Sequence, residues 1–303
     1  MKYMIGKFLL VFLLFSLPSA VLAQGRAIEG LRSEIANCAS SAQGRVGVMA
    51  MLLETGESVS LSGDQRFPLQ SVYKFPIGMA TLHLVDQGRL SLRQKVKVIK
   101  SEYVRSGQHS PIRDKFPQGV TLTIQDLLRY AVSESDGSAS DVLLRVAGGP
   151  VAVMKYLHQL GIDGVIVADT EKEIGRDVSV QYRNWATPQS AVALLHALQE
   201  GKHLSSANRA LLLKLMIETP TGMRRLKGLL PAGTIVAHKT GTSGTTDGLT
   251  HATNDIGIVT LPNGQHFAIA VFVSDSKANA ETREELIAKI ARITWDYWSS
   301  PQH

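Results

Sequence analysis

Residues 234–274 read TIVAHKTGTSGTTDGLTHATNDIGIVTLPNGQHFAIAVFVS, and this stretch decides the fold. Its β pattern predicts three strands, at 234–240, 255–261 and 265–274. The turn Pro262-Asn263-Gly264 joins the last two strands as a hairpin. A β-rich run at 45–54 and a returning strand at 58–62 lie near the other end of the chain.

Helical patterns fill the region between these strands, from about residue 72 to 219. Two of the helices have capped starts, at Thr123 and at Thr187-Pro188. Further helices are expected at 31–42 and at 279–298. Because strands from both ends of the chain must pair across the helical middle, we expect an α/β (α+β) fold. It combines an antiparallel sheet, flanking terminal helices and an inserted all-helical domain.

The expected boundaries place 24–66 and 220–303 in the α/β domain and 67–219 in the helical domain. Residues 162–186 of the helical domain are polar and show no clear periodicity. A stretch of this length without regular structure is unusual inside a compact domain and is often functional. We therefore expect an active-site loop there.

Residues 1–23 have the pattern of a secretory signal peptide. Lys2 and Lys7 give a basic start, a short apolar run follows, and the segment 20–23 ends in small residues. The apolar run is shorter than the roughly 20 residues that a membrane helix needs. We expect cleavage after Ala23, a periplasmic or secreted protein, and no membrane attachment of the mature chain.

Charge and metal-ligand spacing exclude several functions. Loss of the two lysines with the signal peptide lowers the formal net charge from +6 to +4. The remaining basic residues are scattered, which argues against nucleic-acid binding. Cys38 is the single cysteine, and we interpret it as a buried structural thiol. None of the nine histidines forms a His-x-x-x-His or His-x-His pair, so we expect no metal and no cofactor. We expect a monomer.

Three short motifs stand in order along the chain: Ser71-Val72-Tyr73-Lys74, Ser135-Asp136-Gly137 and Lys239-Thr240-Gly241. Each alone occurs by chance, but the ordered set is specific for enzymes that acylate a serine with a β-lactam. If Ser71 opens a helix, Lys74 lies one turn on and can take its proton. Ser135 can relay a proton to a leaving nitrogen. Gly241 would let a ligand approach the backbone closely.

Glu171 is a fourth candidate, in the segment Thr170-Glu171-Lys172-Glu173 of the expected loop. A solvated loop charge is the ordinary interpretation of such a residue. The three motifs favour a catalytic one.

These features together resemble the class A serine β-lactamases over nearly the whole mature chain, and most of all the PER/VEB-like extended-spectrum subgroup. The narrower resemblance rests on Gln70 and on the segments at 170–173, 181–185, 237–244 and 252–255. It implies hydrolysis of the β-lactam amide of penicillins and cephalosporins, including oxyimino-cephalosporins, with small-molecule β-lactams as the partners.

The resemblance also implies residue roles. Ser71 would be the nucleophile, Ser135 a proton shuttle, and Glu171 the activator of the deacylating water. Lys74 and Glu171 are both candidate bases for acylation. The substrate-binding candidates are Gln70, Gly137, Arg225, Lys239, Thr240, Gly241, Thr242 and Ser243. Among them, the backbone N–H groups of Ser71 and Thr242 would form the oxyanion hole.

Four positions depart from the common pattern of that family. Gly137 replaces an Asn that binds the substrate's acylamino group, so we expect open space beside Ser135 at the cleft edge. Gly175 replaces an Asn that helps to hold water. Asp169 and Asn184 stand where a loop-closing Arg–Asp pair would lie, so we expect a different loop conformation.

Arg225 stands where this subgroup places the arginine behind the carboxylate site, although an ordinary surface charge is the alternative.

Two other classes share parts of this pattern. A penicillin-binding protein has the serine and lysine motifs but should lack the loop glutamate. A β-lactam sensor domain stays acylated and normally follows transmembrane helices. A turnover assay separates both from a β-lactamase.

Overall fold

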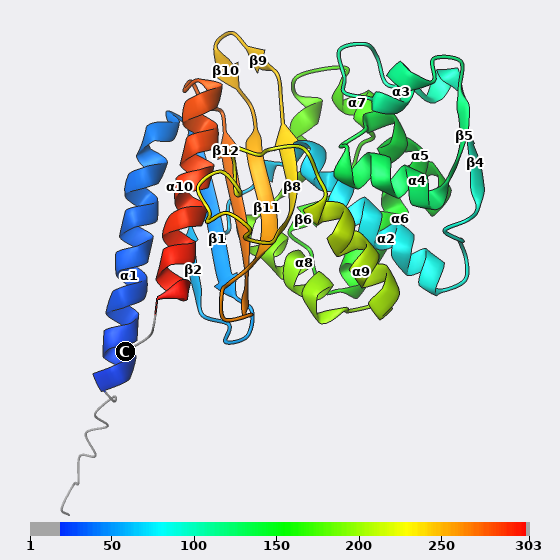
Figure 1. The fold of residues 1–303 in the computed structure, drawn as a ribbon. Coiled ribbons are helices and arrows are strands. Elements are labelled where there is room, and N and C mark those ends of the chain that lie inside the picture. Colours follow the sequence, from blue (N-terminus) through cyan, green and yellow to red (C-terminus); the bar gives the residue numbers. More distant parts are fainter. Residues whose placement is uncertain (1–18, 301–303) are drawn as a thin grey trace, which may run out of the picture.

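The computed structural model describes residues 19–300, and its main sheet combines strands from both ends of the chain (Figure 1). The predicted signal peptide lies outside the described residues apart from 19–23, whose backbone starts the first helix. The strand order is β2-β1-β12-β11-β8, and every neighbouring pair is antiparallel. The strands span Arg45–Leu52 (β1), Ser58–Leu61 (β2), Val236–Thr242 (β8), Thr253–Thr260 (β11) and His266–Ser274 (β12).

The central strand β12 explains why the sheet is covered on both faces. Phe267, Ile269, Val271 and Val273 join one apolar cluster, with the terminal helices. The alternate residues Ala268, Ala270 and Phe272 join the other, with the helical domain. A strand whose two faces are both buried has a nearly continuous apolar sequence, as this one has.

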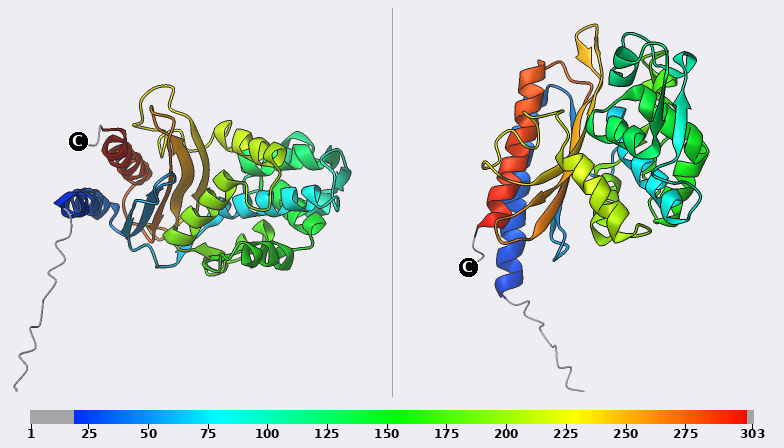
Figure 2. Two further views of the ribbon diagram at one scale, coloured as in Figure 1. Left: turned by 90° about the horizontal axis from the view of Figure 1, so that it is seen from below. Right: turned by 45° about the vertical axis from the view of Figure 1, so that its right-hand side comes forward.

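Helices lie on both sides of the sheet. On one side the N-terminal helix α1 (Ser19–Ala39) lies beside the C-terminal helix α10 (Ala280–Ser299). Both are seen at the left of Figure 1, and the left view of Figure 2 shows them end-on beside the sheet. On the other side, α8 (Pro188–Glu200) packs on β1 and β12, and α9 (Ser206–Ile217) packs on β8. The molecule is thus a sheet between a pair of helices and a helical domain.

The helical domain surrounds the buried helix α2 (Lys74–Asp86), whose interior residues 74–82 are all buried. Besides α8 and α9, its α-helices are α3 (Pro111–Lys115), α4 (Ile124–Leu128), α5 (Gly137–Ala147), α6 (Pro150–Gln159) and α7 (Glu171–Ile174). Short strand pairs complete it, formed by β4 (Lys95–Val98) with β5 (Val120–Thr123), and by β7 (Trp185–Ala186) with β3 (Phe67–Pro68) and β6 (Val165–Ile166). A hairpin of β9 (Thr245–Thr246) and β10 (Leu249–Thr250) follows β8.

Three expectations need correction. The helix predicted at 31–42 begins at Ser19 and ends at Ala39, with a 3₁₀ turn after it. The loop at 162–186 contains regular pieces, namely β6, α7, a 3₁₀ turn and β7, because local caps and pairings organise it despite its polar sequence. The Cys38 thiol is only half-buried, since it lies at the edge of the α1–α10 contact.

Candidate active site

The motif serine lies in a tight turn where the helical domain meets the sheet. Ser71 belongs to the 3₁₀ turn Gln70–Tyr73, which leads directly into α2, so it precedes the helix and does not open it. Gln70 has a left-handed backbone, with φ of 48°. Lys74 starts α2, is 1 % exposed, and its Nζ donates to Ser71 Oγ at 2.7 Å. A buried lysine thus contacts the hydroxyl that the sequence predicts to be the nucleophile.

Ser135 connects two buried lysines. It follows a π-helical turn, precedes α5, and has a φ of 58°, which turns its side chain toward β8. Its carbonyl accepts from Lys74 Nζ at 3.1 Å, and its Oγ accepts from Lys239 Nζ at 2.8 Å. Burial, together with the charge of Lys74, holds the pKa of Lys239 well below its usual value. The hydroxyl of Ser135 is therefore next to groups that can supply a proton.

Glu171 reaches the same lysine from the loop. It is the first residue of α7, which Thr170 caps through its side chain. Glu171 Oε2 lies 3.0 Å from Lys74 Nζ. The carboxylate of Asp141 on α5 accepts from the backbone N–H groups of Glu171, at 2.6 Å, and of Lys172, at 3.1 Å. Burial raises the pKa of Asp141 to about 7.

One cavity of about 650 Å³ lies between the Ser71 turn, the loop of α7 and the end of β8. Ser71 and Glu171 line it, and so do three of the predicted substrate-binding residues: Gln70, Thr242 and Ser243. A buried polar wall lies behind it. Its members are each at most 7 % exposed: Lys74, Ser135, Lys239 and Thr240. The motifs at 135–137 and 239–241 thus contribute no residue to the cavity lining itself.

Arg225 is a buried part of this wall, so the surface-charge interpretation of it is wrong. Its side chain is 7 % exposed and forms an ion pair with Glu284 at 3.3 Å. Its Nη2 donates to Thr242 Oγ1 at 2.7 Å, and its Nη1 donates to the Asn254 carbonyl at 2.9 Å. Arg225 therefore positions Thr242 and adds positive charge beside the predicted carboxylate pocket.

Two glycines have other neighbours than the sequence predicts. A Cβ at Gly137 would lie 2.6 Å from Glu171 Cγ, and the residue is buried, so it is not an open position at the cleft edge. Nor does Gly137 have a positive φ. A Cβ at Gly241 would lie 2.3 Å from the Leu69 carbonyl. Gly241 therefore allows the close approach of the Ser71 turn to β8, where we had expected the close approach of a ligand.

Gly175 leaves room for a glutamine from another segment. A Cβ there would lie 2.6 Å from each amide atom of Gln108. The Gln108 Nε2 group donates to the Glu171 carbonyl. Gln70 also makes contact with the loop, since its Nε2 donates to Gln181 Oε1 at 2.5 Å. Both amides tie the loop to its surroundings.

The loop closes through the amide of Asn184, which is fully buried. Its Oδ1 accepts from the backbone N–H groups of Ala168, at 2.7 Å, and Asp169, at 2.9 Å, and its Nδ2 donates to the Asp169 carbonyl at 3.0 Å. Asp169 also lies 3.0 Å from the exposed Arg183. The ends of the loop are thus held by an amide clamp.

The sequence interpretation did not single out three residues of this site: Tyr73, Gln108 and Asp141. Tyr73 Oη donates to Glu171 Oε2 at 2.9 Å. Its signal was a phenolic hydroxyl directly between the apolar Val72 and the motif lysine. Asp141 was visible as an acid one turn after Gly137 in the apolar helix α5. Gln108 lies in an irregular segment and had no signal.

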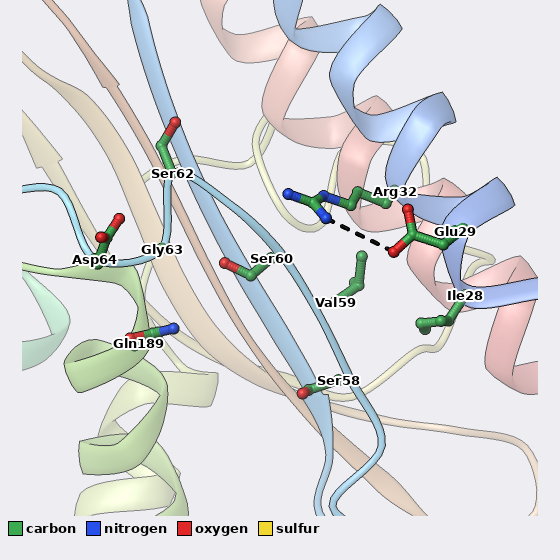
Figure 3. Close-up of a pocket in the computed structure, with 10 residues that line it drawn as sticks. All are labelled: Ile28, Glu29, Arg32, Ser58, Val59, Ser60, Ser62, Gly63, Asp64 and Gln189. Atoms are coloured by element: carbon green, nitrogen blue, oxygen red, sulfur yellow. Dashed lines mark ion pairs between the residues drawn. The ribbon is translucent and has the colours of Figure 1, made fainter. Parts of the chain in front are cut away.

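A second cavity, of about 300 Å³, lies away from these residues (Figure 3). Its lining comes from α1, from β2 and the turn after it, and from Gln189 of α8. Its charged groups include the ion pair of Arg32 with Glu29, at 3.7 Å. None of the motif residues lines it, so we place the chemistry in the larger cavity.

A serine that is hydrogen-bonded to a buried lysine, in this fold of a sheet and a helical domain, is the arrangement of serine hydrolases that work through an acyl-enzyme. The comparisons with known proteins give the family. The chain matches the β-lactamase enzyme family over residues 30–298 and belongs to it. It is a class A enzyme that hydrolyses the β-lactam amide and so confers antibiotic resistance.

Three relatives illustrate the match. The chain is 40 % identical to β-lactamase VEB-1 of Pseudomonas aeruginosa, covering 95 % of this chain and 97 % of the relative. It is 40 % identical to the extended-spectrum β-lactamase PER-1 of the same species, covering 88 % and 87 %. The crystal structure of a β-lactamase from Chitinophaga pinensis superposes with a TM-score of 0.86 at 46 % identity, covering 88 % of this chain and 98 % of that one. Within residues 19–300, no helix has the length and apolar character to cross a membrane.

Proposed function

We propose that this β-lactamase acylates Ser71 and hydrolyses the ester with a water activated by Glu171. In the first half-reaction Lys74 passes a proton to Glu171 and then takes the proton of Ser71, whose oxygen attacks the lactam carbonyl. The 2.7 Å and 3.0 Å contacts of Lys74 Nζ support this path. The backbone N–H groups of Ser71 and Thr242 stabilise the oxyanion.

Cleavage of the lactam needs a proton on the leaving nitrogen. Ser135 donates it and takes a replacement proton from Lys239, which contacts its hydroxyl. The proton held by Glu171 then passes by way of Lys74 and Ser135 to Lys239, so Glu171 is again a carboxylate and both lysines are charged. In the second half-reaction the Glu171 carboxylate takes a proton from water, whose oxygen attacks the ester carbonyl. The proton then returns to Ser71 as the product acid leaves.

The substrate carboxylate binds where positive charge and hydroxyls meet. Lys239, Thr240 and Thr242 contact it, with Arg225 behind Thr242. Thr240 Oγ1 is oriented by Thr221 Oγ1 at 2.8 Å. We propose penicillins and cephalosporins as substrates, including oxyimino-cephalosporins, because the 650 Å³ cavity extends along the loop and a relative is named an extended-spectrum enzyme.

The position of Glu171 is the single observation that carries the mechanism. A carboxylate 3.0 Å from the lysine that contacts Ser71 gives the acyl-enzyme a base for hydrolysis, which a penicillin-binding protein or sensor domain does not need. The test is a nitrocefin assay with the mature protein and its Ser71→Ala variant. We expect many turnovers per molecule for the parent and none for the variant. One turnover per molecule of the parent would contradict the proposal.

We further propose that the chain is exported, cleaved after Ala23, and monomeric. Intact-mass measurement of the exported protein tests the cleavage, and its sedimentation tests the monomer. A mature N-terminus elsewhere than Gln24 would place the cleavage differently.

A further inference from the structure

Tyr73 is a fully buried residue of the Ser71 turn whose hydroxyl lies between two acceptors. Its Oη is 2.9 Å from Glu171 Oε2 and 3.3 Å from Ser140 Oγ. The Ser140 hydroxyl has another acceptor, because its Oγ donates to the Gly137 carbonyl at 2.8 Å. The single proton of Tyr73 therefore goes to the shorter contact, the one with the charged carboxylate.

Because of this contact, the two oxygens of the Glu171 carboxylate have different numbers of hydrogen-bond donors. Oε2 receives both Tyr73 Oη and Lys74 Nζ, at 2.9 and 3.0 Å. Among residues 19–300, no side chain or backbone N–H donates to Oε1. Glu171 lines the cavity beside Ser71, so Oε1 is the oxygen left for a water molecule.

The two donors to Oε2 behave differently during a catalytic cycle. Lys74 contacts Ser71 as well as Glu171 and exchanges protons in the proposed mechanism. Tyr73 stays protonated, because burial and then the negative charge of Glu171 raise its pKa well above the usual value. Its hydroxyl is thus the donor whose contact does not depend on the charge of Lys74.

We propose that the Tyr73 hydroxyl is a positioning group that holds Glu171 Oε2, so that Oε1 faces the water in deacylation. The inference rests on the proposed role of Glu171. Tyr73 touches neither substrate nor the attacking water, and it acts only through the carboxylate. Acylation needs this hold much less, because Lys74 itself contacts both Ser71 and the Glu171 oxygen that takes its proton.

The test is Tyr73→Phe, which removes one oxygen from a buried ring and leaves the packing unchanged. For a substrate whose deacylation limits turnover, we expect kcat and KM to fall together, by at least roughly tenfold, as for a lost hydrogen bond to a charged group. We expect kcat/KM, which reports acylation, to stay within about twofold of the parent. Intact mass under turnover should show an accumulated acyl-enzyme.

Two reference variants separate the possible outcomes. Tyr156→Phe is the matched control, because Tyr156 is also buried but its hydroxyl has no hydrogen-bond partner among the described residues, and we expect parental kinetics. Glu171→Gln removes the acceptor of the Lys74 proton, so it should acylate more slowly and then stall as an acyl-enzyme. If it does not stall, the proposed role of Glu171 fails.

Two results would overturn the inference while leaving the proposed function intact. In both, Glu171→Gln stalls as expected. In the first, Tyr73→Phe deacylates as fast as the parent. In the second, Tyr73→Phe loses kcat and kcat/KM equally along with melting temperature, which is the signature of a structural residue.

Discussion

At the residue scale, Gly137 lies so close to Glu171 that a side chain at this position has no space. A Cβ at this position would lie 2.6 Å from Glu171 Cγ and 3.3 Å from the His109 carbonyl. A larger side chain must displace the glutamate or strain α5, at a typical cost of about 1–3 kcal/mol for overpacking. Gly137 therefore leaves space for the Glu171 carboxylate, and its absent side chain is not simply a lost contact with substrate.

We predict that Gly137→Ala slows deacylation by roughly tenfold and lowers the melting temperature by several degrees. Gly137→Asn should do the same, in place of the tighter substrate binding expected if an added amide met open space. The measurements are kcat, acyl-enzyme mass and thermal unfolding. Gly30→Ala is the control, because a Cβ there meets nothing within 4 Å. Tighter KM with unchanged stability in Gly137→Asn would contradict this account.

Arg225 and its neighbour Arg224 form a natural pair for comparison, because both form ion pairs with Glu284. The Arg225 side chain is 7 % exposed and donates to Thr242, whereas that of Arg224 is 68 % exposed. A hydrogen bond to a charged group contributes about 1.5–3 kcal/mol, whereas an exposed ion pair contributes about 0–1 kcal/mol.

We predict that Arg225→Ala raises KM by at least roughly tenfold for penicillins and cephalosporins. It should also lower the melting temperature, because Glu284 loses its buried partner. Arg224→Ala should leave KM within about twofold. Equal effects of the two substitutions on KM, measured by steady-state kinetics, would contradict this prediction. They would mean that Arg225 acts only as an ion-pair partner of Glu284 and does not support the substrate pocket.

At the scale of elements, the start of the short helix α7 is bound by Asp141, whose carboxylate accepts two of its backbone N–H groups. Burial raises the pKa of this carboxyl from 3.8 to about 7. Between these values the folded protein binds a proton that the unfolded chain does not bind. The resulting stabilisation is fully present below about pH 4 and is lost as the pH rises through about 7.

We predict that the free energy of unfolding of the parent falls relative to that of Asp141→Asn as the pH rises from about 4 to about 7. The asparagine does not titrate, and other groups cancel in the difference. Chemical denaturation of both proteins at several pH values measures it. A difference that is independent of pH would mean that Asp141 titrates near its ordinary value.

Most elements were predictable, but only some of their ends were. The helices after Thr123 and Thr187 begin where their capping residues predict. The first sheet strand of the C-terminal half was expected at 234–240 and spans Val236–Thr242, because pairing with β11 fixes its register. Tertiary contacts of this kind are absent from the local sequence pattern.

At the scale of the molecule, the site forms where distant parts of the chain converge. The Ser71 turn, the Ser135 segment, the loop of α7 and strand β8 each contribute a side chain. The ordered motifs were enough to predict that Ser71, Lys74, Ser135 and Lys239 lie together. The sequence could not show that Tyr73 also bonds Glu171, because that contact joins positions 98 residues apart.

Gly137 and Gly241 were misinterpreted because their neighbours are distant in the sequence. A missing side chain in a sequence does not reveal what fills the space. In the folded chain Glu171 occupies the space beside Gly137, and the Leu69 carbonyl occupies the space beside Gly241. Both neighbours come from other elements.

The central claim is that one molecule forms an ester on Ser71 and uses Glu171 to hydrolyse it. The most direct measurement follows the intact mass of the Glu171→Gln variant over time after mixing with a cephalosporin. We predict one added acyl group per molecule, carried on Ser71 and persisting after the parent under the same conditions has returned to its free mass. Turnover by the variant at the parental rate, with no accumulated adduct, would contradict the account.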